Sequence, residues 1–458
     1  MPDDRIRSRL DRRSVLKGLG ASGIAGLAGC LGGDDEDGLQ GPDNTTDGTA
    51  TGGSEDATEV EFWEYFGSTE QDEVKSLVEE FNSTHDDIQV KMSNVPFENF
   101  FDKVFSAVAS QEAPHVTTYW GSFSNYMVQE GAIAPIDEYM EVSLDDYYES
   151  ARPAMKVDGE TYGLPMDVHG LMLISNDNVL EEAGVEEIPQ DWESFQEACD
   201  TIKENTDATP FGLVENGTST AGMRAYFSVL QQEPDGRLVN QTDDGWEVVY
   251  DQNDAGLNAM EFVDTVTENE WDSTDLADDE ERLTKFMENE LGFFLGGNFH
   301  INYWQDDDEL VDDLELTYSK PFVFPGGENG TFGESTGYFF PKDPSHTEEE
   351  KQAAVRFAEW ITQNNPLWAQ TAGHLPAAIE VAESDEVRES RYYREDELGI
   401  VSTLEEMASK GELVQQPTLP VDLYGTGISQ PILDVYAQNK EPKEALQESA
   451  DALRQQLS

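Results

Sequence analysis

The chain has 458 residues, of which 96 are acidic and 27 are basic, so its formal net charge is -69. A negative charge of this size excludes polyanionic partners such as nucleic acid and anionic membrane surfaces. Because molar salt shortens the Debye length to about 3 Å, the composition is typical of a protein adapted to brine. Hydrophobic residues make up 37% of the chain, which is enough for packed cores and excludes a disordered protein. The length favours two domains over one.

The first thirty residues have the features of an export signal. Arg12 and Arg13 precede an apolar stretch, 15–29, that is too short and too rich in glycine to remain a membrane span. The segment RRSVLK resembles a twin-arginine signal, and LAGC resembles a lipobox that ends at Cys30. We therefore expect residues 1–30 to be a twin-arginine lipoprotein signal, with Cys30 lipidated at the outer face of the cell membrane. Residues 31–57 are polar and acidic, and we expect them to form a disordered tether.

Beyond the tether, strand and helix patterns alternate. The expected strands are 60–63, 88–92 and 115–120, and the amphipathic helices between them are about 70–81 and 97–108. This order predicts a parallel sheet covered by helices, in which ligands bind at the carboxyl ends of the strands. Later patterns predict a strand at 291–295 and helices at 191–203, 254–267, 348–362 and after Pro442.

The residue types needed for several other functions are missing. Besides Cys30, the chain has Cys199, which lies at helical spacing from Phe195 and Ile202 and is expected to be a core residue, so no disulfide framework exists. There is no GxSxG elbow, no HExxH pair and no phosphate-binding glycine loop. We expect no catalytic residue, no metal and no cofactor.

Five segments together resemble a known family. They are VEFWEYFGSTEQDEVKSLVEEFNSTHDDIQV at 60–90 and the segments 157–185, 189–199, 283–301 and 372–377. In this order they resemble family 1 extracellular solute-binding proteins, the maltose-receptor-like group, and with the acidic composition they indicate a lipoprotein of a halophilic archaeon. The resemblance implies an α/β chain with the two-lobed periplasmic-binding-protein type II fold, in which hinge crossings join the lobes around a ligand cleft.

By the same analogy, each lobe is assembled from separate parts of the chain. Lobe 1 is expected to contain 58–167 plus about 320–365, and lobe 2 to contain 168–319 plus about 366–458. The crossings are expected near 164–168, 319–322 and 364–366, and hinge motion there would close the cleft.

The resemblance places ligand contacts in several loops. The first strand's loop offers Phe66 and Ser68, although Ser68 could equally cap the following helix. Trp120, followed by Gly121 at a strand end, presents an indole face on which a sugar ring can stack. Trp304 is the second expected stacking residue.

The remaining candidates are polar or lie in turns. Asp167 and His169 follow the first crossing, and Arg224 could clamp a hydroxyl pair or an anion with its planar guanidinium. Asn298 lies in the family's cleft region, and Gly373 and His374 lie in the AGHLPA turn.

The function implied is that of a monomeric receptor that captures a solute, with a sugar or oligosaccharide as the expected ligand, and delivers it to an ABC permease and its ATPase. One departure leaves the ligand class open, because ESTGYFF at 334–340 replaces the glycine-rich loop usual in sugar receptors. A polyol phosphate such as glycerol phosphate is an alternative ligand, for which Arg224 would matter more. A secreted glycoside hydrolase using two carboxylates and a component of a cell-surface layer are alternatives from other classes.

Overall fold

The computed structural model describes residues 57–213, 220–242, 245–272, 279–306, 309–311, 314–415, 417–421 and 428–458. The expected signal, Cys30 and nearly all of the expected tether lie outside these residues. All the described residues belong to one compact unit, Gly52–Ser458. Within them, no helix combines the length and the apolar character that crossing a membrane requires.

A five-stranded sheet is built from the N-terminal part of the chain and one returning segment. Its strands follow the order β2 (Ile88–Asn94), β1 (Thr58–Glu64), β3 (Val116–Trp120), β16 (Thr336–Phe339) and β6 (Gly163–Pro165). β1 pairs in parallel with β2 and with β3, as the alternating pattern predicts. The sheet as a whole is mixed, because β16 enters beside Trp120 at the carboxyl end of β3 and therefore runs against it.

A second sheet is centred on β7 (Asp167–Asn176), whose ten residues are all buried. Its strands follow the order β18 (Leu413–Gln415), β15 (Thr331–Glu334), β7, β11 (Leu291–Gly297) and β8 (Thr209–Gly212). β14 (Leu316–Ser319) and β17 (Leu375–Pro376) also pair with β7. A strand buried along its whole length explains why the DVHGLMLISN segment lacks polar alternation.

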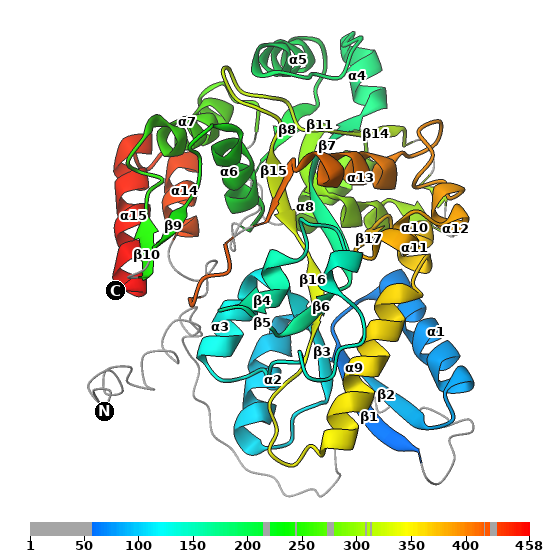
Figure 1. Cartoon of the computed structure of the whole chain (residues 1–458). Coiled ribbons are helices and arrows are strands. Elements are labelled where there is room, and N and C mark those ends of the chain that lie inside the picture. The colour runs from blue at the N-terminus through cyan, green and yellow to red at the C-terminus, as the bar shows by residue number, and fades with distance from the viewer. Residues whose placement is uncertain are drawn as a thin grey trace, which may run out of the picture. The chain divides into compact units, whose positions relative to one another are not determined.

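Two single-residue links join the sheets. Met166 connects β6 to β7, within the crossing expected at 164–168, and Ser335 connects β15 to β16. Figure 1 shows β15 and β16 as successive arrows that run from one sheet into the other. This second link lies later than the expected 319–322, because β14 at that position still pairs with β7 in the second sheet. The chain crosses from the first sheet to the second a third time, in the segment that follows α9 (Glu348–Gln363) and precedes β17.

Helices cover both sheets, and local sequence signals set several of their ends. α1 (Ser68–Thr84) and α9 pack together, and α9 also contacts β1 and β6. A capping box between Thr347 and Glu350 begins α9, and another between Asp191 and Ser194 begins α5 (Trp192–Asn205). The other helices of the first sheet are α2 (Phe97–Ser110), α3 (Ser124–Gln129) and α10 (Leu367–Thr371).

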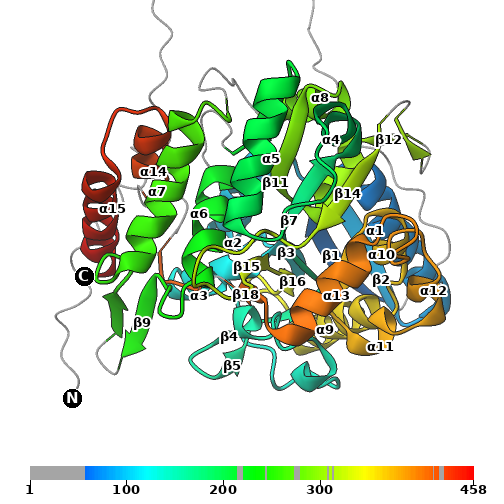
Figure 2. The same cartoon turned by 90° about the horizontal axis from the view of Figure 1, so that it is seen from above.

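The helices associated with the second sheet include a C-terminal group in which α7, α14 and α15 pack against one another. Figures 1 and 2 both show these three side by side, and Figure 2 shows α13 lying over β7 and β14. The helices are α4 (Asp177–Ala183), α5 (Trp192–Asn205), α6 (Thr220–Gln232), α7 (Asp254–Glu268), α8 (Asp279–Met287), α13 (Ile400–Lys410), α14 (Ser429–Tyr436) and α15 (Pro442–Leu457). The remaining elements include the hairpin of β9 (Val239–Thr242) and β10 (Gly245–Val248), the small pairs β4 (Lys156–Val157) with β5 (Glu160–Thr161) and β12 (Gln305–Asp306) with β13 (Glu309–Leu310), and the short helices α11 (Ile379–Ala382) and α12 (Asp385–Arg388).

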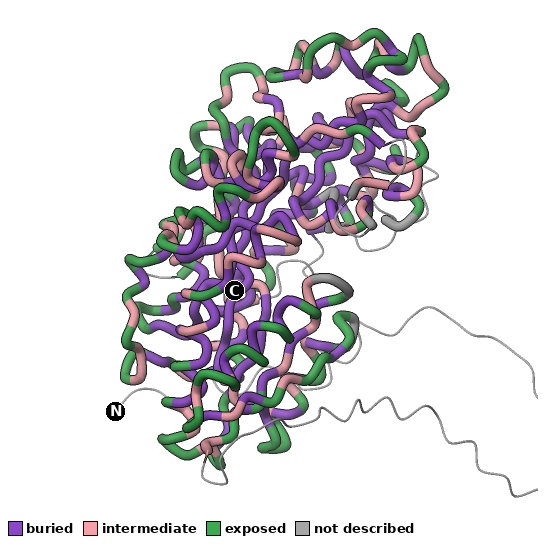
Figure 3. The backbone as a smooth tube through the Cα atoms, turned by 90° about the vertical axis from the view of Figure 1, so that its right-hand side faces the viewer, coloured by how far each residue is buried: buried purple, intermediate pink, exposed green. Residues whose placement is uncertain are grey.

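The buried side chains form two large clusters, which follow the purple stretches of Figure 3. One contains Phe62 and Phe357 and continues along β7 as far as Ile174. The other contains Phe195 and Cys199 beneath the second sheet. Burial raises the pKa of the Cys199 thiol well above its usual value, so Cys199 is the inert core residue that its spacing predicts.

The close packing of β7 predicts that Gly170→Ala lowers the free energy of unfolding by about 2 kcal/mol. A Cβ at Gly170 would lie 2.6 Å from the Phe332 carbonyl oxygen and 2.6 Å from Leu413 Cδ2, and the first of these is backbone that cannot turn away. Urea unfolding in molar salt measures the change. Gly67→Ala is the matched control, because a Cβ there meets nothing within 4 Å and should change stability by less than about 0.5 kcal/mol. Equal midpoints for the two variants would refute the tight contact.

Candidate functional site

Four titratable side chains meet where β7 leaves its link to the first sheet. Asp167 and His169 lie two positions apart on β7 and so point to the same face. His374 directly precedes β17, which pairs with the start of β7, and Glu70 lies in the first turn of α1. We call these four residues the carboxylate–histidine cluster.

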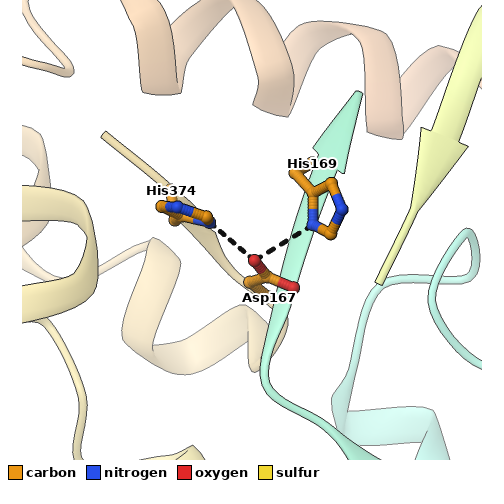
Figure 4. Close-up of side chains that lie close together, drawn as sticks. All are labelled: Asp167, His169 and His374. Carbon is orange, nitrogen blue, oxygen red and sulfur yellow. Dashed lines mark hydrogen bonds and ion pairs between the residues drawn. The ribbon is translucent and has the colours of Figure 1, made fainter. Parts of the chain in front are cut away.

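The cluster is centred on one carboxylate oxygen. Asp167 Oδ2 lies 2.6 Å from His374 Nδ1 and 3.1 Å from His169 Nδ1, as Figure 4 shows. The other oxygen, Oδ1, accepts a hydrogen bond of 2.8 Å from the Thr336 amide. His374 Nε2 lies 3.3 Å from Glu70 Oε1. Asp167 thus connects two histidines and the start of β16.

The charges in the cluster support one another. Burial alone would raise the pKa of Asp167, but the neighbouring His169 and His374 outweigh it and hold that pKa well below its usual range. Burial alone would lower the pKa of His374, yet its hydrogen bonds to Asp167 and Glu70 raise it to about 9. At neutral pH His374 is therefore an imidazolium between two carboxylates, which compensates the burial of charge.

Aromatic rings and one cation lie at the carboxyl end of β3. The Arg224 guanidinium, from α6, lies 5.2 Å from the centre of the Trp120 ring and 5.2 Å from that of Phe332. The Phe97 ring lies 5.5 Å from Trp120, and Phe97 is 45% exposed. We call Phe97, Trp120, Arg224 and Phe332 the aromatic–arginine group. It combines side chains from both sheets and leaves an apolar surface exposed.

Buried oxygen atoms with free hydrogen-bonding capacity lie between the group and the cluster. Glu334 pairs with His169 across β15 and β7, and its Oε1 accepts from Gln415 Nε2 at 2.7 Å and from the Ser122 amide at 3.1 Å. In the described part of the chain, Glu334 Oε2 and Gln415 Oε1 have no hydrogen-bond partner. Buried polar atoms are rarely left unpaired, so these two indicate a place for an additional donor.

A cavity of about 480 Å³ reaches one of these two residues, Gln415. Gln415 is one of its lining residues, as is Asn125, whose Nδ2 donates to the Thr418 carbonyl and whose Oδ1 has no partner among the described residues. The full lining is Asn125, Ser150, Pro153, Lys156, Val157, Asp158, Gln241, Trp246, Gly411, Leu413, Val414, Gln415, Pro417 and Thr418. The lining residues therefore come from the parts of the chain associated with both sheets. The volume of the cavity is typical of a small-molecule site.

This arrangement of two sheets, single-residue links and a cavity lined by residues of both sheets agrees with the comparisons. The family model for bacterial extracellular solute-binding proteins matches residues 67–365, which is more than half of the chain. The chain belongs to this family.

One relative and two solved structures each match most of the length of this solute-binding protein. It is 22% identical to an arabinooligosaccharide-binding protein of Bacillus subtilis, over 88% of this chain and 93% of the relative. Its structure is similar to that of a cyclic alpha-maltosyl-1,6-maltose binding protein from Arthrobacter globiformis, with a TM-score of 0.74, 19% identity and coverage of 88% and 99%. It is also similar to a maltose-bound protein of T. maritima, with a TM-score of 0.73, 16% identity and coverage of 88% and 100%. The solute-binding protein thus has the expected α/β fold with two lobes.

The structure brings several of the predicted contact residues of this solute-binding protein together. Asp167, His169 and His374 form one cluster, and Trp120 meets Arg224. Asn298 donates from Nδ2 to the Gly373 carbonyl at 3.3 Å. Gly373 has a φ of +67°, a left-handed conformation that favours glycine in this turn.

Other predicted contact residues are packed inside the solute-binding protein. Trp304 has no exposed surface, stacks on Phe286 at 4.5 Å and is therefore a core residue in this conformation. Phe66 is buried against Trp368. A Cβ at Gly121 would lie 2.5 Å from Ala154 Cβ, so this glycine permits close packing. Ser68 begins α1, and its side chain lies outside the described residues.

Sequence reasoning missed some residues of the site. Phe97 is the first residue of the amphipathic helix expected at 97–108, and as the first residue of α2 it lies at an exposed helix end. No sequence pattern pointed to Glu334 and Gln415. Before the fold is known, nothing distinguishes one acidic or amide residue from the many others in the chain.

A buried carboxyl beside the first-strand loop makes stability depend on pH. Glu64 accepts from the Phe66 amide at 2.6 Å, and burial raises its pKa from 4.5 to about 7 despite hydrogen bonds from Asn94 and Phe66 that lower it. The stability contributed by the protonated form is complete below pH 4.5 and is lost as the pH rises through about 7.

We expect Glu64→Gln to gain up to about 3 kcal/mol of unfolding free energy relative to the wild type between pH 4.5 and pH 8. Urea unfolding of both proteins at matched pH and salt measures this difference. A difference that does not change with pH would contradict the raised pKa of Glu64.

Proposed function

We propose that this solute-binding protein captures an oligosaccharide outside the cell and delivers it, chemically unchanged, to an ABC permease and its ATPase. The observation that carries this proposal is the aromatic–arginine group next to unpaired buried oxygen atoms. Sugar rings present apolar C–H faces, which aromatic rings can cover, and hydroxyl groups, which carboxylate and amide oxygens can accept from.

The proposed ligand lies along Trp120 and Phe97 and extends toward the cavity. Trp120 supplies a stacking surface, and Glu334 and Gln415 accept hydroxyl hydrogens from the ligand. Trp246 in the cavity wall offers a further half-buried indole. Relatives named for binding arabinooligosaccharide and cyclic maltosyl-maltose support a ligand with several sugar units.

Closure of the two lobes would trap the ligand. Met166 and Ser335 are single-residue links between strands of different sheets, so rotation about them would move one sheet relative to the other. A ligand drives closure only if it binds the closed form more tightly, and contacts from both sheets, such as Trp120 and Arg224, give that preference.

We further propose that the protein is exported by the twin-arginine signal, is lipid-anchored at Cys30 and acts as a monomer in brine. The acidic composition supports the high-salt environment. A lipid anchor would keep the receptor beside its permease, and the polar tether would separate it from the membrane.

A polyol phosphate is a less suitable ligand. Arg224 already lies over two aromatic rings, and the free oxygen of Glu334 would repel a phosphate. The site therefore favours neutral hydroxyl-rich ligands.

Tryptophan fluorescence titrations test this proposal. The chain starting after Cys30 is mixed in molar salt with arabino-, malto- and chito-oligosaccharides and with glycerol phosphate, and each mixture is then separated by chromatography. We expect saturable quenching by at least one oligosaccharide, which is recovered intact. Shortened sugar products would instead support a hydrolase, and quenching by glycerol phosphate alone would support the anion receptor.

A further inference from the structure

The carboxylate–histidine cluster contains three metal-binding atoms in one place. Asp167 Oδ2, one nitrogen of His169 and one of His374 lie within 4.8 Å of one another. All three residues are more than nine-tenths buried. Both imidazoles direct the same nitrogen, Nδ1, at the same carboxylate oxygen.

We propose that Asp167, His169 and His374 form a binding site for a divalent transition-metal ion of the Zn²⁺ class. Two imidazole nitrogens and one carboxylate oxygen are a donor set that Zn²⁺ prefers, whereas Ca²⁺ and Mg²⁺ prefer oxygen alone. The ion replaces the protons that these nitrogens donate to Asp167.

The distances require only small movements for binding. Zn²⁺ bonds of about 2.0–2.1 Å in a tetrahedron separate neighbouring ligand atoms by roughly 3.3 Å. The observed separations from Asp167 Oδ2 are 3.1 Å to His169 and 2.6 Å to His374. To admit the ion, the two rings would move slightly away from the carboxylate, and their nitrogens, now within 4.8 Å of each other, would reach a similar separation of roughly 3.3 Å.

The surroundings of the cluster match those of metal sites. A histidine that binds a metal through one nitrogen usually donates its other N–H to a carboxylate, which fixes its tautomer and orientation. His374 Nε2 lies 3.3 Å from Glu70 Oε1 in this way. The Thr336 amide holds Asp167 Oδ1, which leaves Oδ2 directed at the histidines.

Metal binding would also affect how the sheets are connected. Asp167 is the first residue of β7 after the Met166 link, while His374 ends the third passage between the sheets. A bound ion would tie these two passages together near the proposed sugar site. The site is thus suited to a structural ion in the hinge region.

Calorimetry with Zn²⁺ tests the proposal. The chain starting after Cys30 is stripped with a chelator and titrated in molar NaCl with excess Mg²⁺, which occupies surface carboxylates. We expect one Zn²⁺ per chain. His169→Gln and His374→Gln should each weaken Zn²⁺ binding at least about a hundredfold, because each removes a direct ligand. Glu70→Gln should weaken it about tenfold, as loss of an outer hydrogen bond does.

His85→Gln is the matched control, because His85 stacks on Phe81 away from the cluster, and it should bind Zn²⁺ like the wild type. Co²⁺ gives a second readout on the unaltered protein: intense visible absorption indicates the expected four-coordinate site. Weak absorption typical of six-coordinate Co²⁺, or equal Zn²⁺ affinity in the wild type and in His169→Gln, would overturn the proposal. Oligosaccharide quenching of the chelator-treated protein is measured separately, so failure of the metal site is distinguishable from failure of the proposed sugar receptor.

Discussion

Replacing Asp167 with alanine is expected to lower the free energy of unfolding by about 3–5 kcal/mol. Asp167 is fully buried, and its carboxylate holds the Thr336 amide and both histidines. Its removal leaves the charged His374 without its main partner and frees the start of β16. Urea unfolding in molar salt with a chelator present measures the loss without any contribution from metal.

An exposed carboxylate provides the control for this prediction. Asp72 lies exposed on α1, so Asp72→Ala removes the same charge from the surface and should change stability by less than about 0.5 kcal/mol. If Asp167→Ala unfolded at the same urea concentration as Asp72→Ala, the cluster could not be holding the links together.

The second large effect is on ligand affinity. We expect Trp120→Ala to weaken oligosaccharide binding by about 2 kcal/mol, or roughly thirtyfold in Kd, because the ligand loses the apolar face that it covers. The cation of Arg224 also loses one of its two rings. Fluorescence or calorimetric titration with the best oligosaccharide measures the change.

Trp360→Ala is the matched control for Trp120→Ala. Trp360 is also half-buried, but it lies on α9 and packs against Phe81 of α1, not beside Arg224. Both variants should lose some thermal stability, and only Trp120→Ala should lose affinity. Equal affinities for the two variants would remove Trp120 from the proposed site.

Much of the first sheet could be predicted from hydrophobic patterns alone. The strand expected at 60–63 is β1, Thr58–Glu64, and the helix expected at 97–108 is α2, Phe97–Ser110. The hydrophobic residues of these elements recur with a strong local period, and most of the same residues face the core in the fold. The antiparallel addition of β16 was not predictable, because its partner β3 lies more than 200 residues earlier and nothing local specifies the pairing.

The family resemblance predicted which residues lie near the site. It could not predict how the side chains of those residues pack. Asp167, His169 and His374 were expected contacts, but their meeting at one oxygen depends on the pairing of β17 with β7. Trp304 lies just after the segment 283–301 that resembles the family. However, the 3-10 turn Asn298–Tyr303 before it directs the Trp304 ring against Phe286 in the core. Whether an aromatic side chain faces a ligand or the core depends on such turns, which composition and periodicity do not determine.

In the proposed function, an oligosaccharide binds between the two lobes and draws them together. This closure can be measured by small-angle X-ray scattering of the chain starting after Cys30, in molar salt with and without saturating oligosaccharide. The radius of gyration should fall when the sugar is added and should stay constant with a sugar that does not quench fluorescence. Identical scattering curves at a concentration of sugar that saturates the fluorescence signal would contradict capture by closure.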